Sequence, residues 1–428
     1  MLIAVAVVAV IVVLAALVLV TVLRSTLSDN KGAMYDGSLV AADYWTEEPQ
    51  ILSAGLGFDG IIGSTADDQQ TTVDAGGAWD AEMQCSKGAG PTDADRSSLV
   101  PSSSLPLVSL IEEGKDPEYV DGTPVVFSWP VRTDTLRPSQ FRWTLNTGEV
   151  VGTDAITMTP NFELNERNTV VMFTELGNRG LPGEPDARYP VRLDIVPASD
   201  GTELMLAGPE GDVSATGLTK DTDNSPYVSG PTLVGAKLNR IDSPPQGEGP
   251  VAQNGTASMP NDERTLFGEQ GDFRLRMLTT GGFSPDGIRG VLPTDFETFF
   301  RIHAIGPDGE EVILDRVGMP YEVQGGTLTI VGISDLGKPA STADDIFYDD
   351  CYADDRDNYL DIIIEGSDSA ARSITDLEIP ALDGGYAAFY NPGGPGQTPT
   401  PGVRYTAPGP ATLQSVIIAL DDPMRVDR

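Results

Sequence analysis

The amino-acid sequence predicts a mainly β fold, with a long N-terminal apolar α-helix followed by one or two β-sandwich-like (immunoglobulin-like) domains. The first 23 residues are apolar and carry no charge, and the following chain is acidic and holds all 47 Gly and 33 Pro. From about residue 119, strand-length apolar runs alternate with turn signals. These patterns divide the chain into a stem (1–46), a loop-rich connection (47–116), a β-sandwich-like domain (117–200) and a second β-rich region (201–428).

The apolar segment is long enough for a membrane. As a helix, residues 1–23 reach about 34 Å, which spans a hydrocarbon core. A cleavable signal would begin with basic residues and have a shorter apolar run. The first basic residues here are Arg24 and Lys31, and by the positive-inside tendency they would hold the following chain in the cytoplasm. That chain is acidic and rich in predicted β-strands, which argues for a body outside the cytoplasm. We therefore expect the numbering to begin at a processed N-terminus, with an initiator Met1 as the alternative.

Residues 1–45 resemble the N-terminal part of type IV pilin-like proteins. In that family a basic leader is removed, the mature chain begins with an apolar stem, and an amphipathic continuation leads into a globular head. The continuation here has an apolar stripe made of Leu27, Met34, Leu39 and Val40. Val5 stands where bacterial major pilins usually carry glutamate, so the resemblance is to an archaeal-type, minor or atypical pilin. It implies self-assembly through the stem, with the membrane as its location before assembly.

The charge balance excludes several partners. The chain has 27 Lys and Arg against 64 Asp and Glu, a net charge of −37. Such a chain repels nucleic acid and anionic membranes, so we expect no nucleic-acid partner. Acidic, lysine-poor surfaces suit high salt, which screens their self-repulsion. A cation-binding or simply soluble acidic surface is the alternative.

Besides a short strand at residues 50–56 and a terminal strand, ten runs read as β-strands. The first domain contains four, separated by turn signals such as those at residues 146–148 and 178–180: 124–130, 140–145, 169–174 and 189–196. The second region contains six: 203–207, 273–278, 299–305, 311–314, 327–331 and 359–364. Residues 306–309, Gly-Pro-Asp-Gly, predict a hairpin turn, and residues 415–420 a terminal strand.

Motifs for catalysis are weak or missing. His303 is the single histidine, on a predicted strand, and neither a Gly-x-Ser-x-Gly sequence nor an activated-cysteine context accompanies it. One His and two distant Cys nearly exclude zinc sites, and the glycine-rich run at 393–396 lacks the ending of a phosphate-binding loop. Pairs of carboxylates are abundant by chance among 64 acids. We predict no enzymatic activity and no organic cofactor.

Three candidate sites remain. The acidic run at 344–361 predicts a calcium site, and its ligands would be Asp355, Asp357, the Tyr359 carbonyl and Asp361. A solvated acidic loop is the alternative. Cys85 and Cys351 are candidates for one disulfide, or for two buried thiols. Asn254 begins the one N-glycosylation sequon.

Together these features predict a structural subunit of an extracellular pilus-like filament on the cell surface. It would polymerise with copies of itself through the apolar helix, leave its β-rich heads outside, and reside in the cytoplasmic (inner) membrane before assembly. The alternative is a single-pass, membrane-anchored surface or adhesion protein that does not polymerise.

Overall fold

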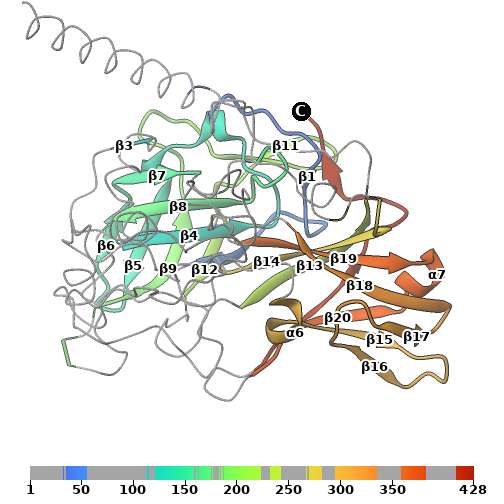
Figure 1. Ribbon diagram of the computed structural model, residues 1–428. Coiled ribbons are helices and arrows are strands. Elements are labelled where there is room, and N and C mark those ends of the chain that lie inside the picture. Colours follow the sequence, from blue (N-terminus) through green and yellow to red (C-terminus); the bar gives the residue numbers. More distant parts are fainter. Residues whose placement is uncertain are drawn as a thin grey trace, which may run out of the picture.

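The computed structural model describes ten stretches of the chain and a few single positions. The stretches are residues 35–54, 113–114, 121–158, 163–174, 188–222, 232–241, 269–281, 295–334, 358–381 and 411–428. They form two β-sandwiches that lie side by side (Figure 1).

The first sandwich consists of a five-stranded and a four-stranded antiparallel sheet around one core. The five-stranded sheet has the order β2-β4-β8-β7-β3. Its strands are β2 (Ile51–Ala54), β3 (Glu113–Gly114), β4 (Asp121–Phe127), β7 (Ala155–Thr157) and β8 (Thr169–Thr174). The four-stranded sheet, β12-β9-β5-β6, consists of β5 (Phe141–Leu145), β6 (Val150–Gly152), β9 (Pro190–Ile195) and β12 (Thr219–Asp221). A hairpin of β10 (Met205–Ala207) and β11 (Asp212–Ser214) adjoins them.

The second sandwich consists of a six-stranded and a four-stranded sheet. The six-stranded sheet, β17-β18-β19-β14-β13-β22, consists of β13 (Leu233–Arg240), β14 (Phe273–Thr279), β17 (Pro320–Val323), β18 (Gly326–Ser334), β19 (Tyr359–Gly366) and β22 (Ile417–Ile418). The four-stranded sheet, β16-β15-β20-β21, consists of β15 (Arg301–Ile305), β16 (Glu311–Leu314), β20 (Ile374–Ile379) and β21 (Thr412–Ser415). Only β22 runs parallel to its neighbour, β13.

The prediction of a long N-terminal apolar helix is wrong for the residues that the structure describes, which contain no such helix. In the described part of the chain the fold is mainly β, and its only α-helices are the single turns α6 (Phe296–Phe299) and α7 (Asp368–Ala371), besides 3-10 turns at Thr133–Thr135 and Pro138–Gln140. Residues 1–31, which hold most of the predicted helix, lie outside the described residues.

The described end of the predicted amphipathic continuation is not helical. Gly37 has φ +79° and Ala41 φ +48°, both in the left-handed region, and the chain then forms the short strand β1 (Ala42–Asp43). Its partner is β23 (Arg425–Val426), near the C-terminus. No helix among the described residues is long and apolar enough to cross a membrane.

The predicted β-strands are confirmed in both sandwiches. Strand β5 alternates as expected for a two-faced strand: Phe141, Trp143 and Leu145 are buried, and Arg142 is exposed. The hairpin turn between β15 and β16 is confirmed by the hydrogen bond from the Gly309 amide to the Gly306 carbonyl, 3.0 Å. The predicted terminal strand is instead split between β21 and β22, in two different sheets.

The two sandwiches stack through their larger sheets. On β4, Val125 and Phe127 enter the first core, whereas Val126 points the other way and packs with Trp45, Leu278 and Tyr359. The central strands β8 and β14 are buried at every position. The order of the layers is therefore the four-stranded and five-stranded sheets of the first sandwich, then the six-stranded and four-stranded sheets of the second.

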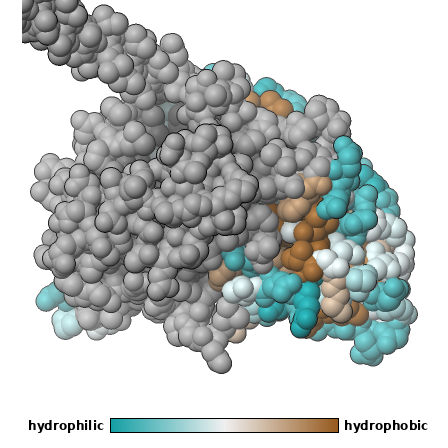
Figure 2. Space-filling model, in the orientation of Figure 1, coloured by the Kyte–Doolittle hydropathy of each residue, from teal (hydrophilic) through white to brown (hydrophobic). Residues whose placement is uncertain are grey.

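The surface has few large apolar side chains. Among the described residues the exposed ones are Val40, Val150, Ile305, Ile313, Met319 and Leu413. Figure 2 shows hydrophilic residues over much of the coloured part of one face, with hydrophobic residues in a narrow band. Apolar burial is therefore concentrated in the two cores and between the sandwiches.

Close packing between the sandwiches gives a first prediction. A Cβ atom on Gly235 of β13 would lie 2.6 Å from the Trp45 ring, so Gly235→Ala should lower the free energy of unfolding by about 1–3 kcal/mol. Gly152→Ala is the control, because nothing lies within 4 Å of its Cβ position; a change within about 0.5 kcal/mol is expected. Urea titrations measure both, and equal effects would contradict the proposed contact.

Candidate functional site

Between the sandwiches lies a group of charged side chains that we call the interface ion cluster. It contains three carboxylates and four cations: Asp43, Glu166, Asp361, Lys237, Arg274, Arg276 and Arg425. None of these side chains is more than 7% exposed. Buried charges at this density need close partners to offset their loss of hydration.

Arg276 lies at the centre of the cluster. It faces Asp361 across the β14–β19 ladder, and its Nε and Nη2 atoms each donate to that carboxylate at 2.8 Å. Its Nη1 is 3.3 Å from Asp43 of β1 and its Nη2 is 2.9 Å from Glu166 of the first sandwich. The guanidinium also lies over the Tyr359 ring, 5.4 Å from its centroid. One planar, multidentate cation thus joins both sandwiches.

Lys237 of β13 brings the C-terminal tail into contact with the cluster. Its Nζ lies 2.5 Å from Asp43 Oδ1 and donates to the carbonyl oxygens of Tyr44, at 3.2 Å, and Met424, at 2.9 Å. An ammonium has three donors, and each has an acceptor here. The Trp45 ring packs against it, 5.2 Å from Nζ to the centroid. Lys237 therefore holds β13 against both the N-terminal residues of the body and the C-terminal tail.

Burial and neighbouring charges set the protonation of this pair. Burial by itself raises the pKa of Asp43, but Lys237 and Arg276 outweigh it and hold that pKa below its ordinary value. Burial lowers the pKa of Lys237 to about 8, with Asp43 opposing the decrease. Both groups are therefore charged at neutral pH.

Amide and phenol groups extend the contact between the sandwiches. The Tyr359 hydroxyl donates to Asn168 Oδ1 at 3.0 Å. The Asn161 amide donates to Asn358 Oδ1 at 3.1 Å, and Asn358 in turn donates to the Thr279 carbonyl at 2.7 Å. These directional bonds fix how the two sheets are rotated and shifted relative to each other.

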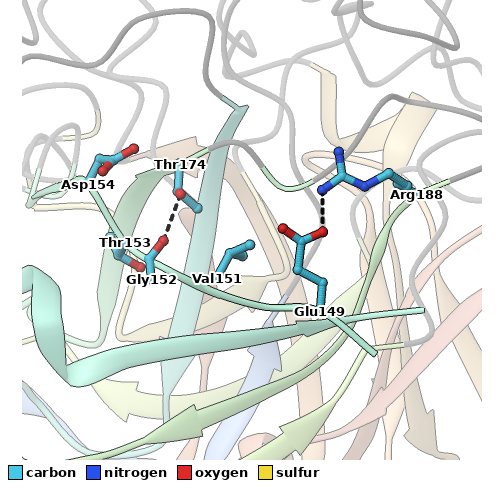
Figure 3. Close-up of a pocket in the computed structure, with 7 residues that line it drawn as sticks. All are labelled: Glu149, Val151, Gly152, Thr153, Asp154, Thr174 and Arg188. Atoms are coloured by element: carbon cyan, nitrogen blue, oxygen red, sulfur yellow. Dashed lines mark hydrogen bonds and ion pairs between the residues drawn. The ribbon is translucent and has the colours of Figure 1, made fainter. Parts of the chain in front are cut away.

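An open polar cleft of about 430 Å³ lies at the edge of the first sandwich (Figure 3). Across it Arg188 and Glu149 form an ion pair at 2.7 Å, and the Thr174 hydroxyl donates to the Gly152 carbonyl at 2.7 Å. Asp154 also lines the cleft. Because the arginine is already neutralised by a carboxylate, the cleft presents no concentrated charge of one sign to a ligand.

His303 is clamped between two acids on the outer face of the four-stranded sheet. Its Nδ1 is 3.0 Å from Glu311 and its Nε2 is 2.7 Å from Glu378. Partial burial lowers its pKa, but the hydrogen bonds to Glu311 and Glu378 outweigh that effect and raise it above the ordinary value. The arrangement favours an imidazolium that links three strands.

The residues predicted as sites lie in different parts of the chain. Asp355, Asp357, Cys85, Cys351 and Asn254 lie outside the described residues, so the calcium, disulfide and glycosylation sites stay predictions. The two remaining calcium candidates are described: Tyr359 is buried in β19, and the Asp361 carboxylate is held by Arg276 and Arg274.

The chemistry of the interface ion cluster is structural. Its seven side chains are almost fully buried and form ion pairs mainly with one another, and within the described stretches no three His, Cys, Asp or Glu side chains gather to hold a metal ion. No family model and no curated protein matches this chain.

The sequence analysis did not predict the interface ion cluster. The signal that could have indicated it was the alternation of arginines with apolar residues in β14.

Breaking the cluster should destabilise the protein strongly. Lys237→Met removes one buried charge and leaves Asp43 and two carbonyl oxygens without their ammonium, so the free energy of unfolding should fall by about 3–5 kcal/mol. Lys220→Met, on the edge strand β12, is the matched control, with a change within about 0.5 kcal/mol expected. Chemical denaturation compares the two, and similar losses would show that the cluster is energetically unimportant.

The single histidine gives a pH prediction. A raised pKa in the folded state means that His303 contributes stability in full below its unfolded pKa of 6.5, and that this contribution is lost as pH rises through the folded pKa. NMR of the one imidazole should give a pKa above 6.5, and Glu378→Gln should lower it. A wild-type value at or below 6.5 would contradict the clamp.

Proposed function

We propose that this protein is a non-enzymatic structural protein of the cell surface, a subunit of an extracellular pilus-like filament. The observation that supports this best is the joining of an apolar segment, residues 1–23, to an acidic double β-sandwich. The residues that follow the segment, 35–45, are built into the junction of the two sandwiches through β1. Force or contacts acting on the apolar segment would therefore reach both sandwiches through residues 35–45.

Assembly would rest on burial of the apolar segments against one another. Each square ångström of apolar surface removed from water contributes about 25 cal/mol, so a bundle of such segments is strongly favoured. An open helical polymer also needs two different contact faces on each subunit. With a net charge of −37, the bodies repel one another, and salt that screens this repulsion should favour the filament.

A second function competes with the first. A membrane-anchored surface or adhesion protein would keep residues 1–23 in the bilayer, because they are apolar and carry no charge. The acidic body would then be displayed singly. The two functions differ in whether purified protein, freed of membrane, forms filaments.

Deletion of residues 1–23 tests the filament directly. The full chain should form filaments visible by electron microscopy, whereas the shortened chain should be a soluble monomer by light scattering, because the apolar surface that drives assembly is gone. Cooperative unfolding of the shortened chain serves as the control for folding. Polymerisation without residues 1–23 would rule out assembly through that segment, and full chains that stay in the membrane fraction would favour the anchor.

A further inference from the structure

We propose that the C-terminal tail, residues 411–428, is a clasp that makes the two sandwiches and the N-terminal lead (residues 35–45) one cooperative unit. The clasp depends only on contacts within one chain. It therefore holds whether the protein forms filaments or stands singly in a membrane.

The path of the tail carries the first part of this inference. The tail begins as β21 at the edge of the four-stranded sheet of the second sandwich, and after Val416 it crosses to the six-stranded sheet as β22. It then leaves that sandwich and pairs as β23 with β1 (Figure 1). One short segment thus contacts both sheets of the second sandwich and the N-terminal lead.

Main-chain hydrogen bonds join the tail to the lead. In the described part of the chain, β23 is the only strand that pairs with β1. The Leu39 amide donates to the Arg428 carbonyl at 2.8 Å, and the Arg428 amide donates to the Leu39 carbonyl at 3.1 Å. At the other end of the pair, the Tyr44 amide donates to the Met424 carbonyl at 3.1 Å. Val426, 5% exposed, enters the first core.

Side chains attach the tail to both bodies. From β13, Asn239 donates to the carbonyls of Ala419 and Pro423, each at 3.1 Å. From the tail itself, Arg425 lies 3.3 Å from Asp43, and Arg428 pairs with Asp212 of β11 in the first sandwich. The tail is therefore held at both ends by different sandwiches, which is the arrangement a coupling element requires.

The alternative is that the tail only covers the edges of the sheets, and it leads to a different expectation. If the tail only shielded sheet edges, its loss would loosen nearby strands and leave the coupling of the sandwiches unchanged. If it is a clasp, weakening its attachment to the lead should free the lead and separate the unfolding of the two sandwiches. Amide exchange and calorimetry distinguish these cases.

The experiment uses the full chain with Arg425→Gln and Arg428→Gln combined. The amides of Leu39 and Tyr44, which donate to the tail, should exchange at least about tenfold faster, and the single unfolding transition should split into two. Arg428→Gln alone is the milder variant should the double variant fold poorly. Arg188→Gln combined with Arg192→Gln removes three surface ion pairs and is the matched control, with no splitting expected.

Each result decides the proposal. Faster exchange at Leu39 and Tyr44 together with two transitions supports the clasp. Unchanged exchange at these amides overturns it, as does a uniform acceleration over the whole chain with one transition, which would be general destabilisation. Filament formation by the unaltered chain is scored separately, so the proposed function can fail while the clasp stands.

Discussion

The position of the two sandwiches depends on one guanidinium. Arg276 binds Asp361 on the neighbouring strand and, from the same planar group, contacts Asp43 of β1 and Glu166 of the other sandwich. Any other docking of the sheets would leave these charges buried without partners, which costs several kcal/mol for each. A well-packed apolar interface could be as stable. What the charged interface adds is one permitted arrangement, because the sheets cannot slide or rotate without breaking several short ion pairs at once.

The contact between the sandwiches explains why arginines alternate with apolar residues in β14, a pattern that by itself suggests an exposed face. In β14, Phe273, Leu275 and Met277 alternate with Arg274 and Arg276, a pattern typical of a strand with one face in a core and one in water. The apolar face lies in the core of the second sandwich. The polar face is instead covered by the first sandwich. Alternation identifies the two faces of a strand but not what covers them, and Asp43 lies 233 positions from Arg276.

The candidate sites show the same limit. The acidic run suggests calcium for Asp361 because its acids are close in sequence, whereas the Arg276 guanidinium that lies directly opposite Asp361 in the ladder comes from a strand distant in sequence. The sequence around His303 gave no sign of Glu378, because this acid comes from β20, 75 positions away. Local signals predicted strands and the turn at residues 306–309, since these depend on neighbouring residues. Pairings across the sheets depend on register, which the sequence of one strand does not specify.

The clasp also has a mechanical consequence if the protein is anchored through its N-terminus. The covalent chain leads from β1 to β2 of the first sandwich and enters the second sandwich only at β13, so Lys237, Arg276 and the tail carry tension to it directly from β1. Strands β1 and β23 are antiparallel, with Leu39 beside Arg428 and Tyr44 beside Met424. Tension enters β1 at the Leu39 end and leaves β23 at the Met424 end, so the strands are pulled past each other. The hydrogen bonds of the pair then share the load, whereas pulling both strands from the same end would break them one after another.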